Sequence, residues 1–227
     1  MGVATDTPVA ATPRSLDVRR LGLVEYGAGL ELQAGLVEER RSGAIGDTLL
    51  LLEHPPVITL GVKTRGQHAN IVASPEVLAA EGVSVFETGR GGDITYHGPG
   101  QLVGYPILDL RPDRCDVHRY VRDIEEALII ALREFDIEGG RLAGRTGVWV
   151  GPDGREEKVA AIGVRISRWI TSHGFALNVG TNLRHFQLIV PCGIADRGVT
   201  SIERLLGRAV PMKDVEDAVV RAFSRVF

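Results

Sequence analysis

Cys192 and Lys158 have the chemistry of a nucleophile and a proton carrier. Cys192 stands between Pro191 and Gly193, directly after the apolar run 188–190, where a side chain at a strand end can meet a pocket. The alternative is a small buried hydrophobic residue, which is what a free cysteine usually is. An ammonium close to the thiol would lower the pKa of the thiol and favour the reactive thiolate. Together the two side chains would form a nucleophile and a proton shuttle that need no histidine.

Lysine is scarce in this chain, so each lysine is a candidate for proton transfer. The 26 basic residues comprise 23 arginines and three lysines: Lys63, Lys158 and Lys213. Arginine keeps its proton near neutral pH, whereas lysine can give its proton up. Lys158 heads the apolar run 158–164, and in a regular strand it shares a face with Ala160 and Ile162. Its ammonium either reaches water or is partly buried, and burial lowers its pKa.

The segment 90–101, with the sequence RGGDITYHGPGQ, contains four glycines and one proline in twelve residues. Such a segment lets backbone approach a ligand closely, or it forms a simple glycine-rich hairpin with one strand in its middle. It matches neither the dinucleotide fingerprint nor the P-loop, so it does not predict a phosphate site.

The segment 172–178 places a histidine beside small residues. His173 is either a base or a hydrogen-bonded structural histidine, while Gly174 and Ala176 predict a wall that leaves room for a ligand. The sequence has no Gly-x-Ser-x-Gly motif, which argues against a serine hydrolase of that type.

The composition is that of a globular domain with 44% hydrophobic and 24% charged residues. We expect a disordered leader over residues 1–16 and one domain over 17–227. A net charge of −3 argues against a nucleic-acid partner, and no apolar run is long enough to span a membrane. Two cysteines indicate a reducing cytoplasm, and no zinc motif is present, so we expect no metal.

The hydrophobic pattern predicts helices that stand apart from clustered strands. We expect helices over 28–41, 117–135 and 215–223, with Asp116 as the N-cap of the second. Strands are expected over 47–52, 56–60, 147–150, 158–166 and 169–179. This arrangement favours an α+β domain around a mostly antiparallel sheet, because strands and helices do not alternate regularly.

Five segments in order resemble the lipoyl(octanoyl) transferase family: 90–102, 144–149, 158–163, 173–178 and 191–194. The resemblance covers the chain from about Leu23 to the C-terminal helix. One departure is Asn182 in the segment 180–183, where the family has an aspartate. This departure lies outside the segments that bear the chemistry.

The resemblance implies the fold of biotin and lipoate protein ligases, with a larger and a smaller sheet and helices outside. It implies that Cys192 takes an octanoyl group from acyl carrier protein as a thioester, with Lys158 as acid and base. A lysine of a lipoyl domain, in a 2-oxoacid dehydrogenase E2 subunit or the glycine cleavage H protein, then takes the group. No ATP or other cofactor is needed. The expected acyl-binding residues are Arg90, Gly91, Gly92, Asp93, Ile94, Thr95, Tyr96, His97, Ala161, Ile162, Gly163, His173, Gly174, Phe175 and Ala176. Backbone N–H groups near Gly163 or Cys192 are candidates for holding the oxyanion.

Three other functions stay open at this point. An ATP-dependent lipoate or biotin ligase on the same fold has no need of a nucleophilic cysteine. A transferase between two lipoyl-domain proteins differs in its donor. A non-catalytic protein that only binds an acyl chain or a carrier protein has no need of either Lys158 or Cys192.

Overall fold

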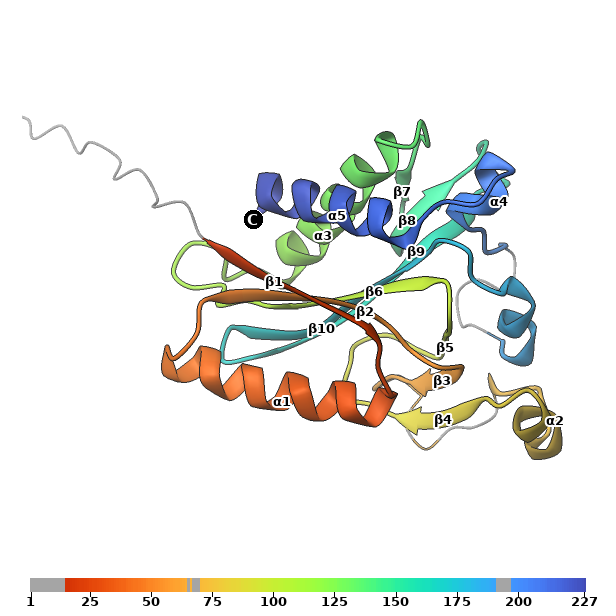
Figure 1. Ribbon diagram of the computed structural model, residues 1–227, viewed down its shortest axis with the longest axis horizontal. Coiled ribbons are helices and arrows are strands. Elements are labelled where there is room, and N and C mark those ends of the chain that lie inside the picture. Colours follow the sequence, from red (N-terminus) through yellow and green to blue (C-terminus); the bar gives the residue numbers. More distant parts are fainter. Residues whose placement is uncertain (1–14, 65, 67–69, 191–196) are drawn as a thin grey trace, which may run out of the picture.

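The computed structural model describes residues 15–64, 66, 70–190 and 197–227, and its centre is a seven-stranded sheet (Figure 1). The strand order is β1-β2-β6-β10-β9-β8-β7, and only β1 and β2 run parallel. The strands are β1 (Leu16–Leu23), β2 (Asp47–Glu53), β6 (Gln101–Ile107), β7 (Gly140–Leu142), β8 (Arg145–Val150), β9 (Glu157–Ser167) and β10 (Ile170–Asn178). The α+β fold with a mostly antiparallel large sheet is therefore confirmed.

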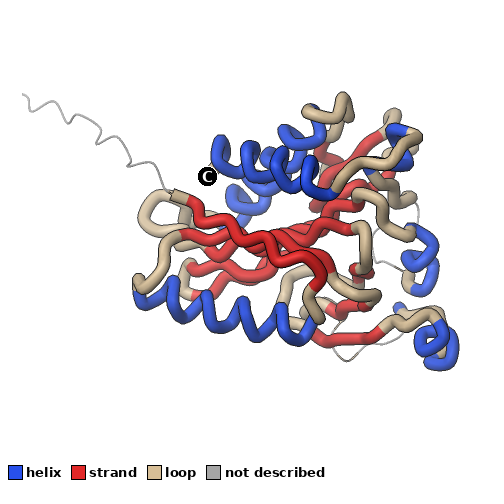
Figure 2. Tube along the Cα trace, in the orientation of Figure 1, coloured by secondary structure: helices blue, strands red, loops and turns tan. Residues whose placement is uncertain are grey.

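A second, smaller sheet lies at one end of the first (Figure 2). Its order is β4-β3-β5, from β3 (Val57–Leu60), β4 (Ser84–Glu87) and β5 (Thr95–His97). The helices are α1 (Tyr26–Ser42), α2 (Pro75–Ala80), α3 (Val117–Arg133), α4 (Ile202–Leu206) and α5 (Met212–Val226), with a 3-10 helix η2 (Leu183–Leu188). Helix α1 covers one face of the large sheet, and α3 and α5 cover the other (Figure 1).

Strand β2 shows why the core has two layers. Leu49 and Leu51 pack in the core beneath α3 and α5, while Leu50 and Leu52 pack in the core beneath α1. All four are at most 1% exposed. A strand covered on both faces has no polar alternation, which is why this run is continuously apolar.

Helix α3 begins at Val117, as the sequence predicts. The Asp116 side chain accepts a hydrogen bond from the backbone N–H of Arg119 at 3.0 Å, so Asp116 is the N-cap. The apolar stripe of α3 is buried against the sheet and α5. Asn182 likewise caps η2, accepting from the N–H of Arg184 at 3.3 Å, a role that an aspartate also fills.

Strand β1 was not predicted from the sequence. It begins at Leu16, inside the range 1–16 assigned to a leader, and Leu16 pairs with Asp47 of β2. Its hydrophobic pattern is weak because it is an edge strand, with Leu21 37% and Leu23 63% exposed. Residues 1–14 of the proposed leader lie outside the described residues. Within the part that is described, no helix is long and apolar enough to cross a bilayer.

Candidate active site

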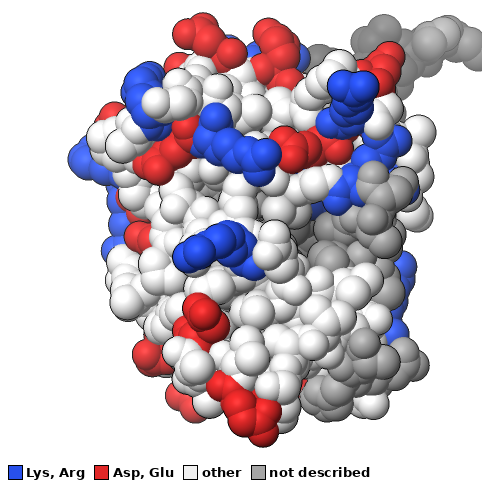
Figure 3. Space-filling model, turned by 90° about the vertical axis from the view of Figure 1, so that its right-hand side faces the viewer, with Lys and Arg blue, Asp and Glu red and all other residues white. Residues whose placement is uncertain are grey.

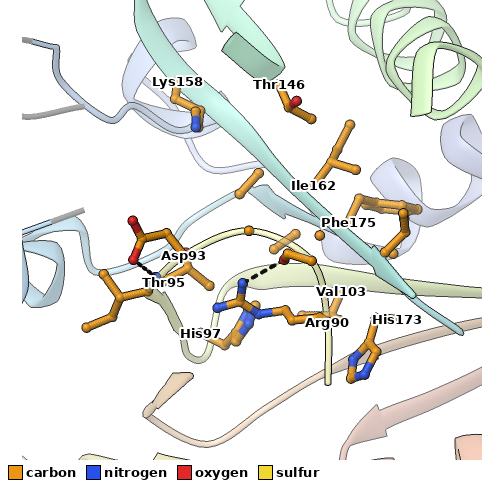
Figure 4. Close-up of a pocket in the computed structure, with 18 of the residues that line it drawn as sticks. Arg90, Asp93, Thr95, His97, Val103, Thr146, Lys158, Ile162, His173 and Phe175 are labelled. Atoms are coloured by element: carbon orange, nitrogen blue, oxygen red, sulfur yellow. Dashed lines mark hydrogen bonds between the residues drawn. The ribbon is translucent and has the colours of Figure 1, made fainter. Parts of the chain in front are cut away.

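A cavity of about 650 Å³ lies where segment 90–97 meets strands β9 and β10. The structure places nearly all the predicted site residues around this single space (Figure 4). Its lining includes Lys158 and the residues Arg90, Gly91, Gly92, Asp93, Ile94, Thr95, His97, Ala161, Ile162, Gly163, His173, Gly174, Phe175 and Ala176. Cys192 lies outside the described residues.

Tyr96 is the one predicted acyl-binding residue that does not line the cavity. Successive side chains of a strand point to opposite faces, so Thr95 and His97 of β5 face the cavity and Tyr96 faces away. Its hydroxyl lies 2.7 Å from Nδ1 of His185, and its ring packs edge-on against Phe186. Tyr96 therefore anchors η2 to the small sheet.

Lys158 lies at the opposite end of the cavity from Arg90 (Figure 4). Its Nζ sits over the ring of Trp149, 4.7 Å from the ring centroid, a cation–π contact. No carboxylate of the described residues forms a salt bridge with it. Burial, and secondarily the charge of Arg145, lower the pKa of Lys158 to about 8. Near neutral pH this side chain can both give and accept a proton.

A β-bulge sets the direction of the Lys158 side chain. Val148 of β8 faces Ala160 of β9, but Trp149 faces Lys158, so β9 has one extra residue, Val159. Val159 and Ala160 are both fully buried in the core beneath α3 and α5. The prediction that Lys158 shares a face with Ala160 is therefore wrong, because the bulge breaks the alternation and leaves Lys158 in the cavity.

The glycines of the cavity wall bring backbones together. A Cβ on Gly163 would lie 2.8 Å from the carbonyl oxygen of Gly91, and one on Gly174 would lie 2.2 Å from that of Gly104 on β6. Gly91 also donates its N–H to the carbonyl oxygen of Val164 at 2.8 Å. These contacts tie segment 90–92 to β9. Close packing of backbone therefore requires glycine at 163 and 174, independently of any ligand.

Arg90 is a buried cation that is held by neutral oxygens. Its Nη2 donates to the carbonyl oxygen of Thr59 at 2.7 Å and to Oγ1 of Thr59 at 2.8 Å, and its Nε donates to the same hydroxyl at 3.2 Å. Its Nη1 donates to the carbonyl oxygen of Gly91 at 3.1 Å. Burial lowers the pKa of Arg90, yet a guanidinium remains protonated near neutral pH. Arg90 therefore contributes a fixed positive charge to one end of the cavity.

A chain of hydrogen bonds joins His97 to the strand that carries Lys158. Nδ1 of His97 donates to Oε1 of Gln101 at 2.7 Å, since burial holds the pKa of His97 at about 3 and the ring is neutral. Gln101 Nε2 donates to Oδ1 of Asn178 at 2.9 Å, and Asn178 Nδ2 donates to the carbonyl oxygen of Thr200 at 2.9 Å. Thr200 donates its N–H to the carbonyl oxygen of Lys158 at 3.0 Å. Gln101 and Asn178 lie in segments that the sequence singles out, but their roles depend on this tertiary contact.

His173 is a wall residue rather than a base near Lys158. Its φ is +53°, and its backbone N–H donates to Oε1 of the buried Gln33 on α1 at 2.7 Å. Burial, followed by the charges of Arg90 and Arg165, lowers the pKa of His173 to about 4, so its ring is neutral. It lies with Arg90 at the far end of the cavity from Lys158 (Figure 4).

Tyr26 and Tyr105 complete that far end, and the sequence did not reveal them. Both line the cavity, and burial raises the pKa of Tyr26 to about 12. The hydroxyl of Tyr105 donates to Nε2 of His54, which in turn donates from Nδ1 to the carbonyl oxygen of Val24. These tyrosines come from α1 and β6, outside any glycine-rich motif.

The described residues on either side of 191–196 form backbone hydrogen bonds with residues at or near this cavity. On one side, Val190 donates its N–H to the carbonyl oxygen of Asn70 at 2.8 Å. On the other side, Gly198 accepts a hydrogen bond from the N–H of Lys158 at 2.9 Å. The described residues on the two sides of 191–196 are therefore bonded to Asn70 and to the cavity residue Lys158.

Comparison with known proteins identifies the family. The model of the lipoyl protein ligase A/B catalytic domain matches residues 25–224. The chain is 57% identical over 215 residues to the octanoyltransferase of Myxococcus xanthus, covering 94% of this chain and 60% of that protein. It is 56% identical over 223 residues to the octanoyltransferase of Acidobacterium capsulatum, covering 93% of this chain and 90% of that protein.

Among solved structures, the fold is similar to that of an archaeal lipoylation system, a bi-partite lipoate protein ligase and its E2 lipoyl domain from Thermoplasma acidophilum. The TM-score is 0.69 at 18% identity, covering 93% of this chain and 84% of that chain. This structural likeness concerns the fold alone. The assignment to a class of enzyme is supported by the sequence relatives at more than half identity. The chain therefore belongs to the lipoyl protein ligase A/B catalytic domain family and, like its octanoyltransferase relatives, is an acyltransferase.

Proposed function

We propose that this enzyme transfers an octanoyl group from acyl carrier protein to a lysine of lipoyl domains through a thioester on Cys192. The observation that carries the proposal is the position of Lys158. It lines the cavity, its pKa is lowered to about 8, and its backbone is bonded to Gly198, just beyond the segment that contains Cys192. Cys192 itself is assigned from the sequence.

In the first half-reaction, the Cys192 sulfur attacks the carbonyl carbon of the octanoyl thioester. The bond between that carbon and the carrier's sulfur breaks as the new bond to Cys192 sulfur forms. Lys158, as an ammonium, stabilises the thiolate of Cys192 and then protonates the departing thiol of the carrier. The exchange replaces one thioester by another, so it requires no ATP.

In the second half-reaction, the amine of a lipoyl-domain lysine attacks the Cys192 thioester. Lys158, now neutral, accepts a proton from the incoming amino group, and the Cys192 sulfur departs as the amide forms. A residue with a pKa of about 8 is well matched to this exchange of protons near neutral pH.

The cavity provides for the acyl chain. Val103, Ile162, Phe175 and Ala176 contribute apolar surface, and Arg90 with its neighbouring tyrosines and histidines closes the far end. Burial of the chain stabilises the complex by roughly 0.8 kcal/mol per methylene before the costs of binding. Binding by this cavity therefore favours a medium-length acyl group.

Both protein partners are proposed to reach the enzyme by transient encounters. The face at the α2 and α4 end of the molecule carries basic and acidic side chains interspersed in its upper half, a basic patch at its centre and acidic side chains in its lower half (Figure 3). It is not a uniformly basic surface, so we expect shape and local charge, rather than long-range attraction, to select the partners. We place the reaction in the cytoplasm, whose reducing conditions keep a cysteine as a thiol.

The test is intact-protein mass spectrometry after mixing the enzyme with octanoyl-carrier protein in the absence of ATP. We expect an octanoyl adduct that hydroxylamine removes and that Cys192→Ser lacks. Cys115→Ser is the matched control, because Cys115 is an exposed free cysteine that does not line the cavity, and this variant should keep the adduct. No adduct, with lipoyl-domain modification only when ATP and free octanoate are added, would show that the enzyme is a ligase.

A further inference from the structure

The cavity lining carries one acidic side chain among several basic ones. Among the described residues, Asp93 is the only carboxylate of the lining, whereas Lys63, Arg90, Arg145 and Lys158 are basic. An octanoyl thioester has no positive charge that would need a carboxylate. The acceptor lysine, however, arrives as an ammonium, and the basic groups disfavour its entry.

The Asp93 carboxylate is held in position through one oxygen. Its Oδ1 accepts a hydrogen bond from the backbone N–H of Ile94 at 2.7 Å and lies 3.5 Å from the Nδ2 donor of Asn70. Figure 4 shows the second oxygen turned away from the bond to Ile94. Because Asp93 lines the cavity and these contacts use only Oδ1, its second oxygen can accept a hydrogen bond from a ligand.

Asp93 is also connected to the other flank of the segment that contains Cys192. Asn70, which bonds Asp93 through its side chain, accepts the N–H of Val190 through its carbonyl oxygen. Lys158 is bonded to Gly198 on the opposite flank. Asp93, through Asn70, and Lys158 are therefore linked to Val190 and Gly198, described residues on opposite sides of residues 191–196.

We propose that Asp93 binds the ammonium of the acceptor lysine and guides it to the thioester. This inference rests on the proposed function, because it concerns the second half-reaction at that site. A charge-assisted hydrogen bond to Asp93 offsets the repulsion by the neighbouring basic groups and orients the nitrogen. Asp93 is thus an acceptor-binding residue.

The step is balanced as follows. The ammonium held by Asp93 passes one proton to neutral Lys158 and becomes an amine. Its nitrogen pair forms the C–N bond as the C–S bond breaks, and the electrons of that bond go to the Cys192 sulfur. The second proton of the former ammonium leaves the nitrogen to protonate that sulfur, which gives the octanoyl amide and the free thiol. Asp93 neither gives nor accepts a proton in this step.

The experiment compares Asp93→Asn with the wild type in each half-reaction separately. Asparagine has the same shape, and its Oδ1 still accepts from Ile94, but it lacks the charge. Acyl-enzyme formation is followed by mass spectrometry, and the isolated acyl-enzyme is then mixed with a lipoyl domain. We expect Asp93→Asn to lower kcat/KM for the lipoyl domain roughly 10- to 100-fold. The same substitution should lower the rate of acyl-enzyme formation far less.

Three further measurements separate an acceptor role from a structural one. Asp93→Glu, which keeps the charge, should recover part of the loss. Release of the acyl group by the neutral nucleophile hydroxylamine should be affected much less than transfer to lysine. Asp153→Asn, at an exposed turn away from the cavity, is the matched control and should leave both half-reactions unchanged.

Equal slowing of both half-reactions by Asp93→Asn would overturn the inference, because it would indicate a structural effect on the cavity. Unchanged transfer to the lipoyl domain would overturn it as well. A wild-type enzyme that forms no acyl-enzyme at all would instead overturn the proposed function. The failures of the two proposals are therefore distinguishable.

Discussion

Two cations stand at opposite ends of the cavity, and the protein holds them in different ways. Arg90 makes three hydrogen bonds to Thr59 and one to Gly91, so its planar guanidinium is fixed. Lys158 rests over the Trp149 ring without a carboxylate partner among the described residues. Burial leaves Arg90 charged but brings the pKa of Lys158 to about 8. One end of the cavity is therefore built to stay charged and the other to exchange a proton.

Replacing the lysine at position 158 by another cation should give the largest effect on catalysis. Lys158→Arg keeps the charge but removes proton transfer near neutral pH, so we expect kcat/KM for octanoyl transfer to fall about 1000-fold. Lys213→Arg is the control, because Lys213 is an exposed lysine paired with Asp217. Steady-state kinetics measure both. A loss below tenfold for Lys158→Arg would mean that the charge alone matters at this end.

The lowered pKa of Lys158 should be visible in the pH dependence of stability. Above pH 8 the folded state loses the Lys158 proton, whereas the unfolded chain keeps it up to the ordinary pKa of 10.5. The unfolded state then binds more protons, so the contribution of Lys158 to the free energy of unfolding rises between these values and is unfavourable below pH 8.

Lys158→Met should remove that rise and be more stable than the wild type at pH 7. We expect a gain of about 2 kcal/mol, less than the full shift converts to, because the side chain is partly exposed. Denaturant unfolding at pH 7 and pH 10 measures both changes. If the free energy of unfolding changed equally with pH in the wild type and in Lys158→Met, a lowered pKa of Lys158 would be contradicted.

A substitution at the Arg90 end should have the smallest effect, and it should change KM rather than kcat. Arg90→Lys keeps the charge but loses the planar set of donors to Thr59, so the wall of the acyl cavity becomes less ordered. We expect KM for the octanoyl donor to rise about tenfold, corresponding to about 1.4 kcal/mol, with kcat and its pH profile little changed. A fall in kcat as large as that of Lys158→Arg would show that the two ends share one role.

A helix with a strong apolar stripe was predictable from the sequence. Helix α3 has an apolar stripe and an N-cap, so its start at Val117 was predicted correctly. Strand β1 was not predicted, because an edge strand beside β2 needs only a weak apolar pattern. The shared face of Lys158 and Ala160 was predicted wrongly, since a one-residue bulge depends on the pairing with β8 and leaves no mark in β9 alone.

The sequence by itself determined which residue types meet in the site. Segments 90–97, 161–163 and 173–176 supplied nearly the whole predicted lining, with Tyr96 as the exception, because motifs of glycine and polar residues are local features of the chain. The tertiary structure alone decided that Asp93, through Asn70, and Lys158 are linked to the residues on opposite sides of 191–196, and that Tyr26 closes the far end of the cavity. These facts depend on hydrogen bonds and packing between segments far apart in the chain, which no local pattern records.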